Sequence, residues 1–463
     1  MRMIGFFLAA AVLLTAVAWH RAPEYDEAYS IFLTAGHARP AWPTGVFTAG
    51  SVRFLFAGPA SFPQIAHDLR TGDVHPPLYF WGLEIWRSVA GPSWFAARML
   101  SVLFTLIGLW LLARLAAAAK IPVIPALFLA LLSYGFAYTG ITARGFALAQ
   151  MCNIAGVYLV FLSVCQRRRR APALVCALAG GVAFGAACFT NYLALFTACA
   201  AFLWLLLTRP RLLPAALVGF LCFLPACAWF FLAQRHSRVG QFEPFSPLHA
   251  LALLAKDSGA TIFGGLPLYA GRFGTVVTLA LAILFLTCIG YVLHHRRAHA
   301  SLFSLTAIAT PCGLFALGLI FGNTPIEIRY LAVSTPFLAL LFAQALPRPL
   351  LALMLLVQTC AIAGLAFAPA TMQPQARAAR FATQAAATYN ALVLLPYGND
   401  GVGIPGPFIA TAPDNMRILL LHPGTRVPDE PTVLAAVAID NESRAVVAGS
   451  GCPSGLVVMG RPR

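Results

Sequence analysis

Long apolar stretches constrain this chain more than any other feature of its sequence. Each is long enough to cross a bilayer as a helix, which takes roughly 20 mostly apolar residues. They lie at about 3–19, 99–118, 122–139, 146–165, 171–188, 191–207, 213–233, 275–293, 301–321, 329–346 and 348–368. With 60% hydrophobic and only 10% charged residues, the composition excludes an ordinary soluble protein. We therefore predict an all-α polytopic membrane protein of about 11 spans.

The basic residues orient these spans. The formal charge of +16 comes almost entirely from arginine, since Lys120 and Lys256 are the only lysines. The arginines form three clusters, at 167–170, at 209 and 211, and at 296–297. If the N-terminus is inside, the eleven spans place all three clusters in the cytoplasm, as the positive-inside rule requires. Because no nucleic-acid-binding signature accompanies the charge, we expect membrane lipids rather than nucleic acid as its partners.

The same threading places every acidic residue outside, although the acids were not used to choose it. The chain has only 15 Asp and Glu residues. The first external loop, at about 20–98, holds Glu24, Asp26, Glu27, Asp68, Asp73 and Glu84. Later loops hold Glu243, Asp257 and Glu327, and the other acids follow residue 368. This agreement independently supports the predicted topology.

Two segments admit a second interpretation. Residues 3–19 resemble a signal peptide, with Ala16-Val17-Ala18 as a cleavage site. We prefer an uncleaved first span, which would hold the acids behind it at the membrane surface. Residues 75–86 could be a twelfth span, but Glu84 would be costly at mid-bilayer. We predict an interfacial helix there, in the outer leaflet.

The sequence changes character after residue 368. A helix is predicted near 374–389, followed by short β-like runs at 391–396, 416–421, 433–438, 444–448 and 455–460. We therefore divide the chain into a membrane domain, 1–368, and an external α/β domain, 369–463. Ten of the 11 cysteines lie in apolar stretches and Cys452 lies alone in the tail, so neither a disulfide nor a cysteine metal site is predicted.

Four polar features project to the predicted outer face. They are Asp26 with Glu27, Asp73 with His75, Arg144 at the mouth of one span, and Arg329 with Tyr330 at the mouth of another. A carboxylate can deprotonate or orient an acceptor hydroxyl. Arginines can hold a phosphate and stabilise the charge that grows on it as it leaves. The set therefore predicts transfer from a lipid phosphate.

Each feature also has a purely structural interpretation. The acid pair is then a solvated loop, and His75 caps the interfacial helix. Arg144 and Arg329 extend their charged ends to lipid headgroups, and Glu327 pairs with a nearby arginine. The convergence of the four features on one face favours the functional interpretation.

The ordered motifs resemble those of a known superfamily. Residues 26–30 read Asp-Glu-Ala-Tyr-Ser, and residues 73–81 read Asp-Val-His-Pro-Pro-Leu-Tyr-Phe-Trp. Further matching motifs lie at 93–98, 143–148, 190–192 and 329–336. Together they resemble the GT-C glycosyltransferases, particularly protein O-mannosyltransferases and lipid A aminoarabinose transferases that use polyprenyl- or dolichyl-phosphate sugars. The resemblance covers roughly residues 1–370. Ala143 and Asn191 depart from the motifs, where relatives often carry an acid and a histidine.

The resemblance implies an inverting sugar transfer from a polyprenyl-phosphate donor to a lipid, glycan or protein acceptor. Asp26 and Glu27 are the implied catalytic residues, and His75, Arg144 and Arg329 the implied phosphate ligands. Asp73, Tyr29, Asn191 and Tyr330 are the implied substrate-binding residues. Some relatives need a divalent cation and others do not. The implied location is the bacterial inner membrane, with the active site and the tail on the periplasmic side.

Two other classes of function compete with transfer. A transporter or flippase of a lipid-linked substrate favours ionisable groups at mid-bilayer, broken helices and repeat symmetry. In this sequence the charges cluster at one face and no repeat is visible. A structural scaffold would give no reason to gather acids, a histidine and arginines on an apolar rim. We therefore favour a transferase.

Overall fold

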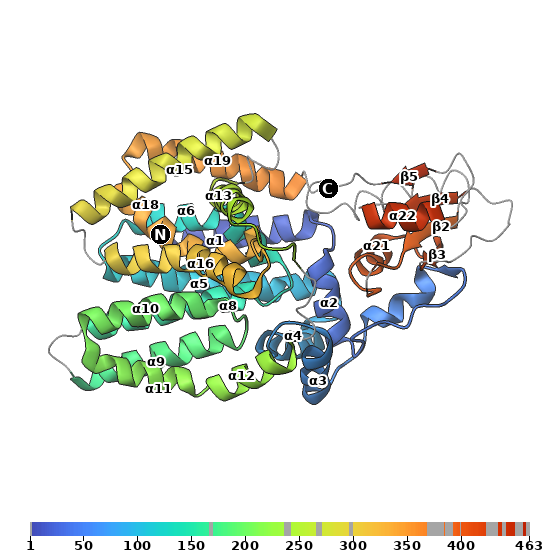
Figure 1. Cartoon of the computed structure of the whole chain (residues 1–463), viewed down its shortest axis with the longest axis horizontal. Helices are drawn as coiled ribbons and strands as arrows, with labels where there is room; N and C mark the ends of the chain where they lie inside the picture. The colour runs from blue at the N-terminus through green and yellow to red at the C-terminus, as the bar shows by residue number, and fades with distance from the viewer. Residues whose placement is uncertain are drawn as a thin grey trace. The chain divides into compact units, whose positions relative to one another are not determined.

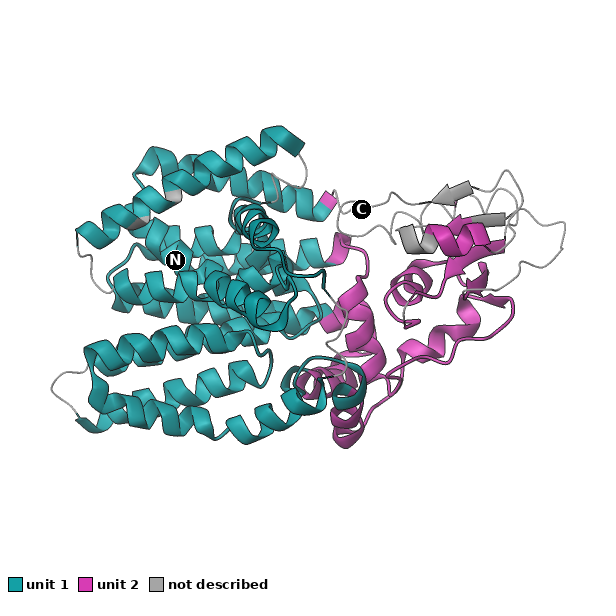
Figure 2. Ribbon diagram, in the orientation of Figure 1, with its two compact units in different colours: residues 1–18, 69–79, 98–366 teal, residues 19–68, 80–97, 367–463 magenta. Residues whose placement is uncertain are grey.

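A computed structural model describes residues 2–165, 170–235, 242–264, 271–295, 300–367, 384, 392–398, 400–422, 434–437, 441–449 and 457–459. It divides the chain into two units, which Figure 2 colours separately. Unit 1 comprises residues 1–18, 69–79 and 98–366. Unit 2 comprises residues 19–68, 80–97 and 367–463. Unit 2 therefore combines most of the predicted first external loop with the tail.

Unit 1 is built from helices (Figure 1). They are α1 (Arg2–His20), α5 (Trp94–Ala118), α6 (Val123–Leu131), α7 (Tyr134–Ile141), α8 (Phe146–Cys165), α9 (Arg170–Cys188), α10 (Ala194–Thr208), α11 (Leu213–Leu221), α12 (Leu224–Ala233), α13 (Pro247–Phe263), α15 (Gly271–His294), α16 (Ala300–Phe321), α17 (Ile328–Leu331), α18 (Thr335–Ala345) and α19 (Arg348–Phe367). Two 3-10 turns, η2 (Pro210–Leu212) and η4 (Ala332–Ser334), precede α11 and α18. The ends of α1 and α5 extend into unit 2.

Eight helices within the described residues are long and apolar enough to cross a membrane, or up to ten spans if each of two bent pairs counts as one. The chain is therefore an integral membrane protein. Each predicted apolar stretch overlaps a helix or a bent pair, but the predicted count of eleven is not confirmed. The predicted stretch at 191–207 matches none of these ten; it overlaps α10, whose 15 residues are short for a span.

Each bent pair has a distinctive residue at the break between its two helices. Helices Pro210–Leu221 and Leu224–Ala233 meet at 51°. Pro225 lies in the first turn of α12, and it cannot donate a hydrogen bond to the preceding turn, which interrupts the helix. Val123–Leu131 and Tyr134–Ile141 meet at 67°, and Ser133 at this break donates its hydroxyl to the Thr261 carbonyl, 2.9 Å away.

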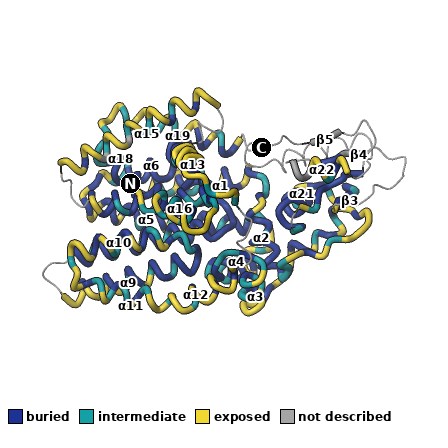
Figure 3. Tube along the Cα trace, viewed as in Figure 1, coloured by how far each residue is buried: buried dark blue, intermediate teal, exposed yellow. Residues whose placement is uncertain are grey.

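Small residues allow the helices of unit 1 to approach closely, as is common in membrane bundles. A Cβ atom added at Gly181 of α9 would lie 1.9 Å from the Ala216 carbonyl oxygen of α11. Large apolar residues are exposed elsewhere, as along α15 at Phe273, Leu279 and Leu286 (Figure 3). Exposed apolar surface of this kind suits contact with lipid chains.

Unit 2 contains α2 (Tyr25–Thr34), η1 (Gly50–Phe56), most of α3 (Phe62–Gly72) and α4 (Leu78–Ala90), α21 (Pro405–Thr411) and α22 (Asn441–Gly449). Its sheet has the order β1-β3-β2-β4-β5. The strands are β1 (Phe47–Thr48), β2 (Leu392–Pro396), β3 (Arg417–Leu421), β4 (Leu434–Val437) and β5 (Val457–Met459). Strand β1 pairs antiparallel with β3, and the other neighbours pair in parallel.

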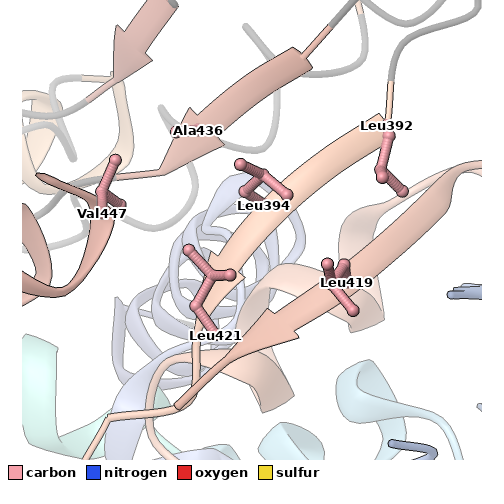
Figure 4. Packing of buried hydrophobic residues seen from close by; sticks show 6 residues of the cluster. All are labelled: Leu392, Leu394, Leu419, Leu421, Ala436 and Val447. Atoms are coloured by element: carbon pink, nitrogen blue, oxygen red, sulfur yellow. The ribbon is translucent and has the colours of Figure 1, made fainter. Parts of the chain in front are cut away.

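The central strands supply the core of this sheet. Leu394 of β2 is in register with Leu419 of β3 and with Ala436 of β4. Figure 4 shows these three residues in one buried cluster, which also includes Leu392, Leu421 and Val447. Because parallel strands need crossover connections, α21 follows β2 and α22 follows β4.

Most of the strands predicted in the tail are confirmed by the structure. The predicted runs at 391–396, 416–421, 433–438 and 455–460 contain β2, β3, β4 and β5. The run at 444–448 was predicted wrongly, since it lies inside α22, the crossover that the parallel pairing of β4 and β5 requires. The predicted helix near 374–389 lies outside the described residues, apart from Gln384. The helix predicted over residues 75–86 corresponds to α4, and its position at the membrane interface stays a prediction.

Candidate functional site

The connection between α3 and α4 holds Asp73 and His75 in a tight turn. The Asp73 Oδ1 atom accepts hydrogen bonds from the backbone N–H of Val74 at 2.5 Å and of His75 at 3.2 Å. Two prolines, Pro76 and Pro77, then follow. A residue before proline avoids the helical region, so the sequence keeps His75 in the connection and delays α4 until Leu78.

Arg144 lies in the short connection between α7 and α8, where it is buried. Its Nη2 atom is 3.1 Å from Asp73 Oδ2 and 3.3 Å from Asp73 Oδ1. The imidazole Nδ1 of His75 is 2.7 Å from Asp73 Oδ1 and 3.0 Å from Arg144 Nη2. The fold therefore joins Asp73, His75 and Arg144, which we call the Asp73 cluster.

The pKa of Asp73 follows from this setting. Burial by itself would raise it, but the charge of Arg144, the pairing with His75 and the hydrogen bond from Val74 hold it well below its ordinary value. Asp73 is therefore ionised at neutral pH, and an ionised carboxylate can only accept hydrogen bonds. A hydrogen bond from His75 Nδ1 to this carboxylate needs a proton on Nδ1, whereas a hydrogen bond from Arg144 Nη2 would need the same atom to accept.

Arg329 and Tyr330 belong to the short helix α17. Arg329 forms an ion pair with Glu327, as predicted, and its guanidinium carbon lies 5.2 Å from the centroid of the Tyr330 ring. The ring of Phe146, two residues after Arg144, has its centroid 6.4 Å from that of the Tyr330 ring. Helix α17 therefore lies close to the start of α8, next to the connection that carries Arg144.

A cavity of about 540 Å³ lies beside these residues in unit 1. Its polar wall includes His75, Asn191, Arg235, Asn323 and Tyr330. The apolar wall comes from residues that include Leu193, Phe231, Phe242, Leu317 and Phe321. A largely apolar cavity with a few polar groups at one side suits an amphipathic ligand.

Asn191 contributes to the cavity from the link between α9 and α10. Its Oδ1 atom accepts a hydrogen bond from the Leu193 backbone N–H at 3.0 Å, which fixes the turn before α10. A side-chain bond of this kind is typical of asparagine in turns. Asn191 therefore has a structural partner as well as a place on the cavity wall.

The sequence did not indicate Gln234, the buried residue at the end of α12. Its Nε2 atom donates to the carbonyl oxygens of Leu69 at 3.0 Å and His75 at 2.8 Å. Its Oε1 atom accepts from the Tyr192 hydroxyl at 2.9 Å. No local pattern could have identified this residue, because every one of these partners is distant in the sequence.

The acid pair lies on α2 in unit 2. Asp26 and Glu27 occupy the first turn of the helix, and both are buried. The Glu27 Oε2 atom accepts a hydrogen bond from the Glu24 backbone N–H at 3.1 Å, so this carboxylate caps its own helix. The Tyr29 hydroxyl is 3.1 Å from that of Tyr25.

Helix α2 packs against the start of α21 and the glycine-containing segment before it, also within unit 2. A Cβ atom added at Gly403 would lie 1.8 Å from Cε2 of Tyr25, and one added at Gly406 would lie 2.9 Å from Cβ of Ala28. The Trp42 indole donates to the Gly401 carbonyl at 2.6 Å. The tail therefore braces the helix that carries the acid pair.

Comparisons with known proteins extend the likeness to the whole fold. No protein family and no curated protein matches the sequence. Two solved structures of ArnT from Cupriavidus metallidurans match with a TM-score of 0.53 each. The undecaprenyl phosphate complex is 13% identical and the match covers 98% of this chain and 89% of ArnT. The apo structure is 14% identical, with 99% and 89% covered. The predicted GT-C resemblance is thus confirmed at the level of the fold.

Proposed function

We propose that this protein is a membrane glycosyltransferase. It would move a sugar from a polyprenyl-phosphate donor to a lipid, glycan or protein acceptor at the periplasmic face of the bacterial inner membrane. The observation that carries the proposal is the Asp73 cluster, in which Asp73 and Arg144 are buried and His75 lines a largely apolar cavity. The chain also has the fold of ArnT, whose structure has been solved with undecaprenyl phosphate bound.

The donor phosphate is assigned to His75, Arg144 and Arg329. A guanidinium has five N–H donors in a planar fork, so one arginine can contact a carboxylate and a phosphate together. Asp73 and Glu327 each neutralise one of these arginines within the protein. The phosphate would then be recognised mainly by directed hydrogen bonds, because the two ion pairs have little net charge. Asp73, Asn191, Tyr330 and Tyr29 remain the proposed substrate-binding residues.

The proposed reaction is a single inverting displacement at the anomeric carbon. The acceptor oxygen forms the new bond to that carbon as the carbon–oxygen bond to the phosphate breaks. Polyprenyl phosphate leaves with the bonding electron pair, and its charge is stabilised by the arginines. Asp26 is proposed from the sequence as the base that takes the acceptor proton. Glu27 would contact sugar or metal, in addition to capping α2.

A divalent cation is an optional part of this proposal. Among the described residues, no group of three or more His, Cys, Asp or Glu side chains is placed to hold a metal ion. The steps above therefore use side chains alone. A chelator followed by addition of Mg²⁺ or Mn²⁺ to the purified enzyme tests whether turnover needs the ion.

Comparative lipid and glycan profiling tests the function directly. Mass spectra of cell envelopes with and without the protein should differ by one glycosylated product. Arg144→Ala should abolish this product, whereas Arg144→Lys should restore it only in part, because lysine cannot bind a phosphate bidentately. A protein that changes the membrane face on which a sugar-lipid is found, without forming a new glycosidic bond, would be a transporter and would contradict the proposal.

A further inference from the structure

The side chain of Gln234 holds a segment of the chain that is far away in the sequence. Its amide donates to the carbonyl oxygens of Leu69 and His75 at 3.0 and 2.8 Å. These two carbonyls lie at opposite ends of the segment that contains Asp73. The Leu69 carbonyl also accepts from the Asp73 backbone N–H at 3.3 Å. Gln234 therefore clamps both ends of the turn that presents the Asp73 cluster.

The same side chain reaches the cavity wall. Its Oε1 atom accepts a hydrogen bond from the hydroxyl of Tyr192 at 2.9 Å, and Tyr192 lines the cavity. The Tyr192 ring packs edge-on against Phe231 of α12, with centroids 5.4 Å apart. One buried amide thus fixes the turn carrying His75 relative to the wall formed by Tyr192 and α12. Its three hydrogen bonds have normal lengths.

We propose that Gln234 is a positioning residue for phosphate recognition. It holds the backbone of His75 at a fixed distance from the cavity wall, so that the imidazole meets the donor phosphate in one geometry. This inference rests on the proposed function. Loss of one hydrogen bond to a charged group costs about 10-fold or more in affinity, so a clamp of this kind has a measurable effect on phosphate binding.

Gln358 provides a matched control in the same unit. It is also a buried glutamine, and its Nε2 atom donates to the carbonyls of Ile262 at 2.9 Å and Leu129 at 3.4 Å. Neither Gln358 nor these two partners lines the described cavity. Its replacement should disturb helix packing to a similar degree without moving His75.

The experiment compares two probes that differ only in the phosphate. Full-length protein in lipid nanodiscs is titrated with polyprenyl phosphate and with the polyprenol of the same chain length. The variants are Gln234→Met, which removes all three hydrogen bonds, and Gln234→Glu, whose carboxylate cannot donate to the two carbonyls. Gln358→Met is the control, and thermal unfolding verifies that each variant is folded.

The wild-type protein should bind the phosphate more tightly than the alcohol. Both Gln234 variants should reduce this preference on the order of 10-fold or more, with little change in affinity for the alcohol, whereas Gln358→Met should preserve it. A loss of affinity for both probes in equal proportion would overturn the positioning role, as would an unchanged preference in either folded Gln234 variant. Equal wild-type affinities for the two probes would overturn the proposed function itself.

Discussion

Replacement of Asp73 by asparagine isolates the charge in the Asp73 cluster. The asparagine oxygen can still accept from the backbone of Val74 and His75, so the turn itself should persist. What is lost is the ion pair with Arg144, at 3.1 Å, and the charged partner of the His75 imidazole, at 2.7 Å. The buried guanidinium of Arg144 then loses the carboxylate charge that faces it at 3.1 Å.

The cost follows from that burial. Removing one partner of a buried ion pair typically destabilises a protein by about 3–5 kcal/mol, and we expect the lower end because the amide oxygen still faces Arg144. Asp73→Asn combined with Arg144→Met should cost less than the sum of the single changes, by on the order of 2 kcal/mol. Asp414→Asn is the control, since its pair with Arg53 is exposed and exposed pairs contribute about 0–1 kcal/mol.

The stabilisation contributed by Asp73 should depend on pH. The folded pKa of Asp73 lies below its unfolded value, which is about 3.9. Its stabilisation is therefore fully present above about pH 4 and is lost as the pH falls through the folded pKa. Unfolding in mixed detergent micelles, followed by circular dichroism, measures these free energies. A loss below about 1 kcal/mol for Asp73→Asn, or additive costs in the double variant, would refute a strongly coupled ion pair.

Two further predictions concern unit 2. Asp26→Asn should lower turnover by about 10²- to 10⁴-fold, the usual contribution of a general base, while the unfolding temperature falls only slightly; near-normal turnover would exclude Asp26 as the base. Gly403→Ala should destabilise the protein by about 1–3 kcal/mol through overpacking, because the added Cβ would lie 1.8 Å from the Tyr25 ring. Gly82→Ala is its control, since an added Cβ there meets no atom within 4 Å, and equal effects in thermal unfolding would contradict the predicted packing of α2 on the tail.

The helices and most strands could be predicted because their signals are local. A run of about 20 apolar residues indicates a spanning helix whatever the rest of the chain does. The run at 444–448 shows the limit of local signals, since Val446 and Val447 favour a strand by composition. Parallel pairing of β4 with β5 demands a crossover, and that demand depends on strands outside the run.

The candidate site was only partly predictable for the same reason. The polar residues of the predicted outer face could be identified, and so could the pairing of Glu327 with a nearby arginine, but not the pairing of Asp73 with Arg144. Asp73 and Arg144 are separated by 71 positions, and a sequence without aligned relatives carries no sign of that contact. The sequence predicts that Arg144 binds a phosphate or reaches lipid headgroups, and it predicts no acidic partner for this residue. The role of Gln234 could not be predicted either, because its amide acts through hydrogen bonds to residues far away in the sequence.

The acid pair illustrates how one sequence pattern can satisfy two requirements. Glu24 is the N-cap of α2, and Glu27 three residues later caps the Glu24 backbone N–H. Carboxylates in the first turn of a helix are also stabilised by its dipole, by about 0.3–1 kcal/mol each. The acidic pattern would therefore be favourable at this position even without catalysis. A catalytic role for Asp26 consequently needs a loss of turnover far larger than this small stability term can produce in a fully folded enzyme.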